Sequence, residues 1–276
     1  MDQQQQHESV ECIFGDSLAL FSGEHHAEIA AHEPPLLFGP LTLTAAPKAN
    51  TLLADHIFSP AFLLAERIER GLIDLSNRSV VELGAGTALP SLLASTLPAS
   101  PTLVVVTDYP DDLILSNLQT NVDRNSSSVT APCTVQCRGY EWGKDPSNLL
   151  RLLSSRGLQS PSEGFDAVVL SDLLHFDRSH GALLDSVCTL LARHDRARVY
   201  VAAGVYTKSD VCTAFLHQAE RRGLLWVDSG AGQDGREVDA VWRGALPVPG
   251  MDRDQLGARK GMCRWWVGRW SDEQLF

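Results

Sequence analysis

The sequence predicts an α/β protein with a mostly parallel β-sheet that is covered by helices on both faces. Between about residues 59 and 228, short apolar runs alternate with segments in which apolar residues recur at helical spacing. Strands that are apolar along their whole length are typical of parallel sheets, because helices bury both faces of such sheets. The chain has 276 residues, which suits one large α/β domain with an extension.

Seven segments are predicted to be strands because each is a short apolar run. These strands cover residues 79–83, 102–107, 133–138, 165–171, 198–204, 224–228 and 263–270. Six helices are predicted before and between them, at residues 59–72, 88–96, 111–123, 146–155, 178–192 and 208–222. A segment rich in Gly and Pro, at about 230–260, is expected to be an insertion before the last strand.

Single residues define some of these elements further. Ser59 is expected to cap the first helix, and Pro60 suits its first turn. The residues expected to face the core from two of the helices are Leu63, Leu64, Ile68, Leu72, Leu113, Leu115, Leu118 and Val122. In the last strand, Trp265, Trp266 and Trp270 are expected to be core residues rather than a binding platform.

Residues 1–50 are assigned to an N-terminal extension whose first ten residues are expected to be disordered, and residues 51–276 to the main domain. The polar, acidic N-terminus lacks the basic and apolar regions of a secretory signal. No apolar run approaches the ~20 residues that span a bilayer. We therefore expect a cytoplasmic protein that does not enter membranes, and we expect it to act as a monomer.

The net charge of −11 argues against a protein that binds the nucleic-acid backbone, because such proteins carry clusters of basic residues. The excess of acidic groups either attracts a cationic substrate, such as a lysine-bearing protein tail, or only keeps the protein soluble. The six cysteines are scattered, with no Cys-x-x-Cys and no Cys/His spacing typical of zinc sites. No metal site is predicted, and the cysteines fit a reducing compartment.

The most informative motif follows the strand at 79–83. This strand leads into Glu82, then a tight turn with Gly84 and Gly86, then a helix. A dinucleotide site would have a third glycine, but that position is Leu89, and a phosphate-binding Gly-Lys-Ser/Thr motif is absent from the turn. A carboxylate at Glu82 disfavours a pyrophosphate but suits the cationic amino-acid end of S-adenosylmethionine (SAM). The two glycines let a ligand lie against backbone N–H groups.

The next strand ends in Asp108 and Tyr109, which complete a nucleoside-binding edge. Asp108 is expected to accept hydrogen bonds from the ribose hydroxyls, and Tyr109 offers an aromatic face to the adenine. Trp142, after the strand at 133–138, is expected to close the adenine pocket, although it could instead cap the edge of the core. Together these residues predict SAM as the cofactor.

A second polar strand end begins at Ser171. Asp172 follows an apolar strand directly, and a charge there is costly unless the strand end is open to a ligand. Asp172 is therefore the candidate that meets the methyl acceptor, with helix capping as the alternative. His175 could accept a proton or orient the acceptor, or it could be structural. Tyr206, after the strand at 198–204, either reaches this pocket or lies at the edge of the core.

These motifs together resemble a known family. The stretches Val-Val-Glu-Leu-Gly-Ala-Gly-Thr-Ala-Leu-Pro-Ser, Val-Val-Thr-Asp-Tyr-Pro, Tyr-Glu-Trp-Gly and Ser-Asp-Leu-Leu resemble the seven-β-strand (class I, Rossmann-like) methyltransferases of the lysine-methyltransferase type. The Asp-Tyr-Pro and Ser-Asp-Leu-Leu-x-Phe segments are most similar to the fungal nicotinamide-N-methyltransferase-like branch. Members of that branch methylate the N-terminus and a nearby lysine of translation elongation factor 1-alpha.

The resemblance covers about residues 50–230 and the last strand, and it implies the strand order 3-2-1-4-5-7-6 with only strand seven antiparallel. It implies that Glu82, Gly84 and Gly86 face the methionine part of SAM, Asp108 the ribose, and Tyr109 and Trp142 the adenine region, and that the segment at Asp172 serves the acceptor. Ser171 is assigned to the cofactor-binding residues. Two departures stand out. Phe58 occupies the place of a family Trp, and His175 occupies the place of a family Tyr or Phe in the motif that begins at Asp172.

Three functions follow from these observations. The first is a SAM-dependent N-methyltransferase that acts on a protein amine, either a lysine or an N-terminus of a translation factor. The second is a small-molecule N- or O-methyltransferase, suggested by His175 and favoured if residues 10–50 roof a closed pocket. The third is a SAM-binding protein without turnover, which ranks lowest because Glu82, Asp108 and Asp172 are all present.

Overall fold

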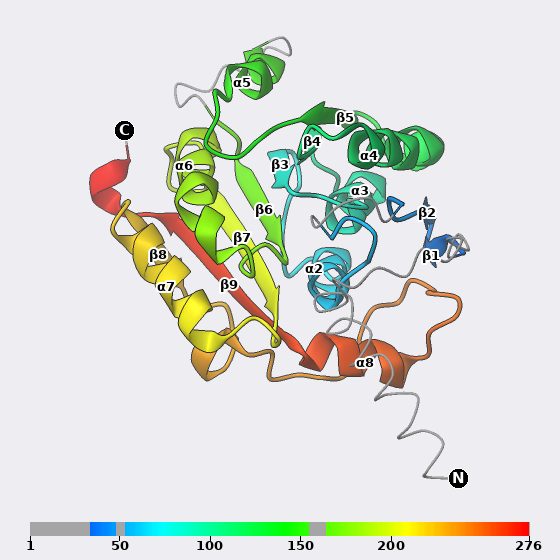
Figure 1. Cartoon of the computed structure of the whole chain (residues 1–276). Helices are drawn as coiled ribbons and strands as arrows, with labels where there is room; N and C mark the ends of the chain where they lie inside the picture. Colours follow the sequence, from blue (N-terminus) through cyan, green and yellow to red (C-terminus); the bar gives the residue numbers. More distant parts are fainter. Residues whose placement is uncertain (1–33, 48–52, 155–163, 276) are drawn as a thin grey trace.

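A seven-stranded sheet forms the centre of the computed structural model, which describes residues 34–47, 53–154 and 164–275 (Figure 1). Along the sheet the strands follow the order β5-β4-β3-β6-β7-β9-β8. Their bounds are β3 (Ser79–Leu83), β4 (Leu103–Asp108), β5 (Thr134–Gly139), β6 (Ala167–Ser171), β7 (Arg198–Gly204), β8 (Leu224–Val227) and β9 (Cys263–Trp270). Only β9 runs antiparallel to its neighbours, so the expected strand order and directions are confirmed.

The chain order of the strands reverses beside β3, which pairs with β4 on one edge and with β6 on the other. In open parallel sheets such a switch point leaves a crevice at the carboxyl ends of the strands, and ligands bind there. The fold therefore positions a binding site at Leu83, Asp108 and Ser171, which end these three strands.

Helices cover both faces of the sheet, as expected. One face packs against α2 (Ser59–Glu69), α3 (Leu89–Thr96), α4 (Asp112–Asn125) and α8 (Arg253–Gly261). The other face packs against α5 (Ser147–Ser154), α6 (His180–Leu190) and α7 (Ser209–Glu220) (Figure 1). Short 3-10 helices cover Ser126–Ser128, Asp177–Ser179, Gln233–Gly235 and Asp272–Gln274.

A small antiparallel hairpin, β1 (Leu36–Phe38) and β2 (Leu41–Leu43), lies within the stretch that the sequence places in the N-terminal extension. Two asparagines of α4 hold β2 and the residue that follows it. The Thr42 N–H donates to Asn125 Oδ1 at 2.9 Å, and the Thr44 N–H donates to Asn121 Oδ1 at 2.9 Å. The first ten residues, expected to be disordered, lie outside the described residues.

Several expectations for the helices are wrong in detail. Ser59 does not cap α2, because Phe58 has the extended backbone of the capping residue and Ser59 is already helical. The helix ends at Glu69, since Gly71 follows with a left-handed φ of 69°, and Leu72 is consequently 52% exposed. Leu113 is also exposed, because it lies in the solvent-facing first turn of α4.

The three tryptophans of β9 lie in the core, as expected. Trp265 belongs to the core on the α2 side, whereas Trp266 and Trp270 belong to the core on the α6 side. Their side chains are between 1% and 8% exposed. A strand that buries aromatic side chains on both faces holds the two cores together.

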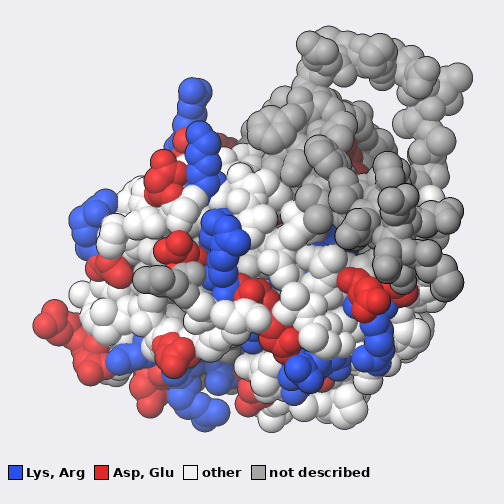
Figure 2. Space-filling view, turned by 90° about the horizontal axis from the view of Figure 1, so that it is seen from below, with Lys and Arg blue, Asp and Glu red and all other residues white. Residues whose placement is uncertain are grey.

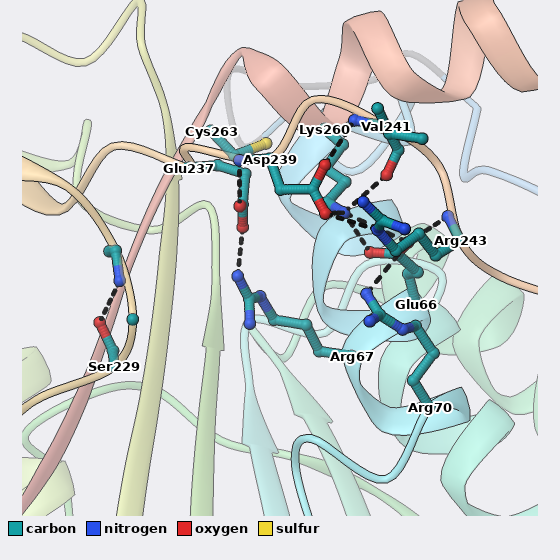
Figure 3. A network of polar contacts seen from close by, with 12 residues as sticks. Glu66, Arg67, Arg70, Ser229, Glu237, Asp239, Val241, Arg243, Lys260 and Cys263 are labelled. Atoms are coloured by element: carbon teal, nitrogen blue, oxygen red, sulfur yellow. Dashed lines mark hydrogen bonds and ion pairs between the residues drawn. The ribbon is translucent and has the colours of Figure 1, made fainter.

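The insertion before β9 contains α8 and is bound to α2 by a network of buried charges (Figure 3). Lys260 of α8 places its Nζ 2.9 Å from Glu66 Oε2, and the two side chains are 1% and 0% exposed. Arg67, the next residue of α2, pairs with Glu237 and stacks its guanidinium 3.7 Å from the ring centre of Trp265. Every charge in the centre of the network therefore has a partner from the other segment, as buried charges require.

We predict that Lys260→Met destabilises the protein by about 3–5 kcal/mol, because Glu66 would remain buried without its cation. Urea unfolding at neutral pH measures this loss. Lys144→Met is the matched control, since the Lys144–Glu141 pair is exposed and separated by 3.8 Å. The control should change the free energy of unfolding by less than about 1 kcal/mol. Equal effects of the two substitutions would contradict the prediction.

Candidate active site

A cavity of about 330 Å³ lies at the carboxyl ends of β3, β4, β5 and β6. Its walls come from four strand ends and from the segment that leads into α2. Most of the lining residues come from Gly84–Thr87, Asp108–Tyr109, Tyr140–Trp142, Ser171–Phe176 and Leu53–Phe58. Within these segments only Asp55 and Leu174 do not line the cavity. The volume lies in the range of about 300–1,000 Å³ that is usual for small-molecule sites.

The turn after β3 bends sharply because three of its residues adopt left-handed backbone angles. Gly84, Gly86 and Ala88 have φ values of 58°, 54° and 60°. A side chain on Gly84 would clash with Leu173 Cδ2 at 2.7 Å, whereas no atom lies within 4 Å of the corresponding position on Gly86. Gly84 therefore permits close packing of the protein, and Gly86 opens its backbone to the cavity, as the cofactor prediction requires.

Asp108 ties the end of β4 to this turn. Its Oδ2 accepts a hydrogen bond from the Gly86 N–H at 2.7 Å, and its Oδ1 accepts one from the Tyr109 N–H at 2.7 Å. The carboxyl lines the cavity but is only 9% exposed, and burial raises its pKa against the effect of these two donors. Asp108 is therefore held in one orientation at the place where a ribose is expected.

Glu82 lies outside the lining of the cavity and is 0% exposed. Among the described residues, neither of its carboxylate oxygens has a hydrogen-bond partner. Burial raises the pKa of Glu82 to about 8, and the neighbouring Ser91 opposes this shift without cancelling it. An unsatisfied buried carboxylate next to the glycine turn is a group that a cationic ligand could stabilise, so the residues present fit SAM.

The predicted aromatic groups lie on the cavity wall. Tyr109 is 46% exposed and Trp142 is half-buried, and both line the cavity. Trp142 packs edge-on against Phe176, with 5.9 Å between ring centroids. The structure therefore brings Tyr109 and Trp142 to the cavity that Asp108, Gly84 and Gly86 also line. Of the predicted cofactor residues, only Glu82 does not line this cavity.

Ser171 and Asp172 line the cavity at the end of β6, the strand that pairs with β3. Asp172 has a left-handed φ of 62° and is 4% exposed. Its Oδ1 accepts a hydrogen bond from the Gly204 N–H at 3.0 Å, and its Oδ2 accepts one from the Tyr206 hydroxyl at 2.5 Å. Asp172 does not cap a helix, and Tyr206 acts behind the wall by orienting this carboxylate.

His175 lines the cavity beside Asp172, with its Nδ1 at 4.0 Å from Asp172 Oδ2. Its side chain is 15% exposed, and within the described part of the chain neither ring nitrogen has a hydrogen-bond partner. Burial lowers the pKa of His175 to about 4, so the imidazole is neutral at physiological pH. A neutral ring offers one donor and one acceptor to a ligand.

Two further aromatic residues of the wall were not selected from the sequence. Phe176 packs against His175 at 4.1 Å between ring centroids, and His56 packs edge-on against Phe58 at 4.7 Å. Phe176 is part of the segment that the sequence marked after β6, so its position could have been noticed. His56 precedes α2 in a segment that showed no motif, and only the folded chain brings it to the cavity.

Over residues 34–47, 53–154 and 164–275, no group of three His, Cys, Asp or Glu side chains is arranged to hold a metal ion. None of the helices described is long and apolar enough to cross a membrane.

Figure 2 shows the molecule from below the view of Figure 1, which is the side toward which the carboxyl ends of β6 and β7 point. Acidic and basic side chains are interspersed over the coloured part of this surface.

We predict that Asp108→Asn weakens the binding of S-adenosylhomocysteine by about 10- to 100-fold, the effect of losing one hydrogen bond to a charged group. Isothermal titration calorimetry measures this affinity. Asp112→Asn, in the exposed first turn of α4, serves as the control and should leave the affinity unchanged. An unchanged affinity in Asp108→Asn would exclude this carboxylate from the cofactor site.

We predict that Glu82→Gln stabilises the ligand-free protein above neutral pH. The pKa of Glu82 is raised from 4.5 to about 8, so wild-type stability falls as the pH rises through this window, because folding then requires the carboxylate to take up a proton. The gain in the variant should be absent near pH 4.5 and grow toward pH 8, by at most about 1.4 kcal/mol per pH unit. Urea unfolding across this range, with Glu141→Gln as the exposed control, tests it. A variant that is less stable than wild type near pH 8 would contradict the burial argument.

Comparisons with known proteins agree with this geometry. Residues 41–222 match a family model described as lysine methyltransferase. A relative from Gibberella zeae, named protein N-terminal and lysine N-methyltransferase EFM7, is 33% identical over 233 residues, which is 82% of each chain. A relative of the same name from Emericella nidulans is 27% identical over 198 residues, covering 71% of this chain and 73% of its own.

Among solved structures, a putative RNA methyltransferase from Pyrococcus horikoshii is similar with a TM-score of 0.47 and 14% identity, covering 83% of this chain and 92% of its own. The family match spans the glycine turn, Asp108, Trp142, Asp172 and His175, which are the residues that form the cavity. The cofactor of this fold is SAM, as predicted. The chain therefore belongs to the family of SAM-dependent lysine methyltransferases.

Proposed function

We propose that the chain methylates a protein amine, either an N-terminus or a lysine, and that elongation factor 1-alpha is the first acceptor to test. The observation that carries the proposal is the second strand end, where the buried Asp172 and the neutral His175 line the same cavity as the glycine turn. The names of the relatives support an amine acceptor in a protein.

The residues divide the cavity into two ends. Glu82, Gly84, Gly86, Asp108, Tyr109, Trp142 and Ser171 are proposed to hold SAM, and Asp172 and His175 are proposed to serve the acceptor. The cofactor supplies an activated methyl group when it is bound. The chain contributes alignment, exclusion of water and a place for the amine proton, because only a neutral amine is a nucleophile and the pKa of free lysine is about 10.4.

Asp172 and His175 have different tasks in this proposal. Asp172 is oriented by Gly204 and Tyr206, so its carboxylate can accept a hydrogen bond from an amine N–H and direct the nitrogen lone pair. Burial lowers the pKa of His175 to about 4, so the ring is neutral at physiological pH, and its unprotonated nitrogen can accept a hydrogen bond from the acceptor amine and orient it. The departure from the family's Tyr or Phe at this position thus adds a hydrogen-bonding group to the wall.

The alternative of a small-molecule acceptor depends on a roof formed by residues 10–50. Within the described part of this stretch, residues 34–47, no residue lines the cavity, and Thr42 and Thr44 bind α4 instead. The remainder of the stretch lies outside the described residues. A protein acceptor therefore stays the first choice.

We also propose that the protein acts in the cytoplasm as a monomer. The five cysteines within the described residues form no disulfide with one another, which suits a reducing compartment. Its exposed large apolar residues are spread over separate elements, such as Leu37 in β1, Leu113 in α4 and Leu225 in β8, rather than gathered in one element.

We predict that the protein transfers labelled methyl groups from SAM to a protein in fungal lysate, at an N-terminus or a lysine. Mass spectrometry identifies the site, with elongation factor 1-alpha examined first. Asp172→Asn should lower the rate by about 100-fold or more, as loss of a proton-handling group does. Asp177→Asn, an exposed carboxylate of the same loop, is the control and should retain the wild-type rate.

The other outcomes separate the alternatives. Label that appears only in small molecules would contradict a protein acceptor and favour the second function. Binding of SAM without labelled product in any fraction would favour a non-catalytic protein. A protein labelled on another residue type would contradict the amine.

A further inference from the structure

The corner between α8 and β9, residues 259–264, contacts two segments that form the acceptor end of the cavity. This corner lies beyond residue 222, where the match to the family model ends. It belongs to the stretch that the sequence presented only as an insertion. Its contacts are therefore a property of this chain that the family model does not describe.

Arg259 provides the first contact. Its Nη2 donates a hydrogen bond to the Ile57 carbonyl oxygen at 2.6 Å, and its guanidinium lies 4.6 Å from the ring centre of Phe62 in α2. Ile57 and Phe58 line the cavity. Arg259 therefore binds the backbone of a cavity wall and the helix that follows this wall.

Arg264 and Met262 provide the second contact. Arg264 Nη1 donates to the Thr207 carbonyl oxygen at 2.9 Å, and the Val205 N–H donates to the Met262 carbonyl oxygen at 2.8 Å. These bonds hold both sides of Tyr206. Since the Tyr206 hydroxyl donates to Asp172, the corner reaches the carboxylate proposed for the acceptor through one side chain.

The two segments meet at the acceptor end. The ring of Phe58 lies 6.1 Å from that of Tyr206 and 6.5 Å from that of His175, measured between centroids. A shift of the Ile57–Phe58 backbone would therefore change the space beside His175 and Asp172. The glycine turn and Asp108 are held by other bonds, to Thr107 and Gly86, in which the corner takes no part.

The corner itself is fixed by the charge network of Figure 3. Lys260, the residue after Arg259, is bound to Glu66, one turn beyond Phe62 in α2. The buried ion pair of Lys260 with Glu66 therefore restricts how the neighbouring Arg259 can lie relative to α2.

We propose that Arg259 is a positioning residue that sets the acceptor end of the cavity by holding the Ile57–Phe58 wall against Tyr206 and His175. The acceptor assignment rests on the proposed function, whereas the holding of the wall does not. Arg259 acts through Phe58 and touches no reacting group.

The test compares Arg259→Ala with Arg253→Ala in the full-length protein. Arg253 lies on the same helix and also donates to backbone carbonyl oxygens, those of Trp242 and Gly244, neither of which lines the cavity. We expect Arg259→Ala to raise the acceptor KM by about tenfold, the equivalent of one hydrogen bond to a charged group. Its affinity for S-adenosylhomocysteine should stay near the wild-type value, and Arg253→Ala should leave both quantities unchanged.

Hydrogen exchange provides a readout that does not need turnover. In Arg259→Ala, protection should fall in peptides that cover residues 53–62 and remain unchanged in peptides that cover residues 139–143. Arg259→Gln, which retains a side-chain donor, should recover part of the protection and part of the KM, and it replaces the alanine variant if that variant does not fold. Arg259→Lys retains the charge and has donor hydrogens on one nitrogen. Its acceptor KM and its protection from exchange should lie between those of Arg259→Gln and of wild type.

Unchanged exchange at residues 53–62, or equal effects of the Arg259 and Arg253 variants, would overturn the positioning role. An increase in the dissociation constant for S-adenosylhomocysteine as large as that in the acceptor KM would overturn the restriction to the acceptor end. If the wild-type protein methylates no protein amine, the proposed function fails, and the exchange measurement still decides whether Arg259 holds the wall.

Discussion

The hydrogen bond between the Gly86 N–H and the Asp108 carboxylate joins the ends of two neighbouring strands and shapes the turn on which the site is built. Gly84 and Gly86 adopt their left-handed angles without strain, whereas the same angle is strained at Ala88, so contacts from the surrounding protein must hold the turn. The bond to Asp108 is one of these contacts, and α3 begins at Leu89, directly after the turn. It thus shapes the crevice at the switch point of the sheet, where the cofactor is expected.

The two ends of the cavity use carboxylates in opposite ways. Asp172 is buried but has donors on both oxygens, so its charge is compensated within the protein. Glu82 is buried, and Ser91 only partly opposes the rise of its pKa, so this residue costs stability when it ionises. The two carboxylates thus differ in how far the protein itself compensates their charge.

Sequence patterns predicted the elements that a local signal marks, namely a short apolar run for a strand and a glycine motif for the turn. All seven strands of the sheet are present, and Asp108, Gly84 and Gly86 lie where their motif implies. The pairing order came from the family resemblance, because apolar runs alone do not say which strands are neighbours. Glu82 differs from its expected place, since alternation along β3 turns it behind the wall rather than onto it.

The missed features depend on distant partners. Helix α8 carries Gly257 within it and few apolar residues, so periodicity did not indicate a helix, although Asp252 and Gln255 form a capping box that could have marked its start. Leu113 matches a helical stripe but lies in the exposed first turn of α4. His56 lies just before α2, a helix that is bound in part by Lys260, a residue 194 positions after Glu66.

That separation has a consequence for the order in which the chain becomes folded. Glu66 and Lys260 are 194 residues apart. A ribosome that adds about 5–20 residues per second needs on the order of 10–40 s to make the residues between them. During that interval Glu66 lacks the cation that accompanies it into the interior, and α2 has only its contacts with earlier elements such as α3 and β7. The charge network around Glu66 can be completed only after the C-terminal corner has been made.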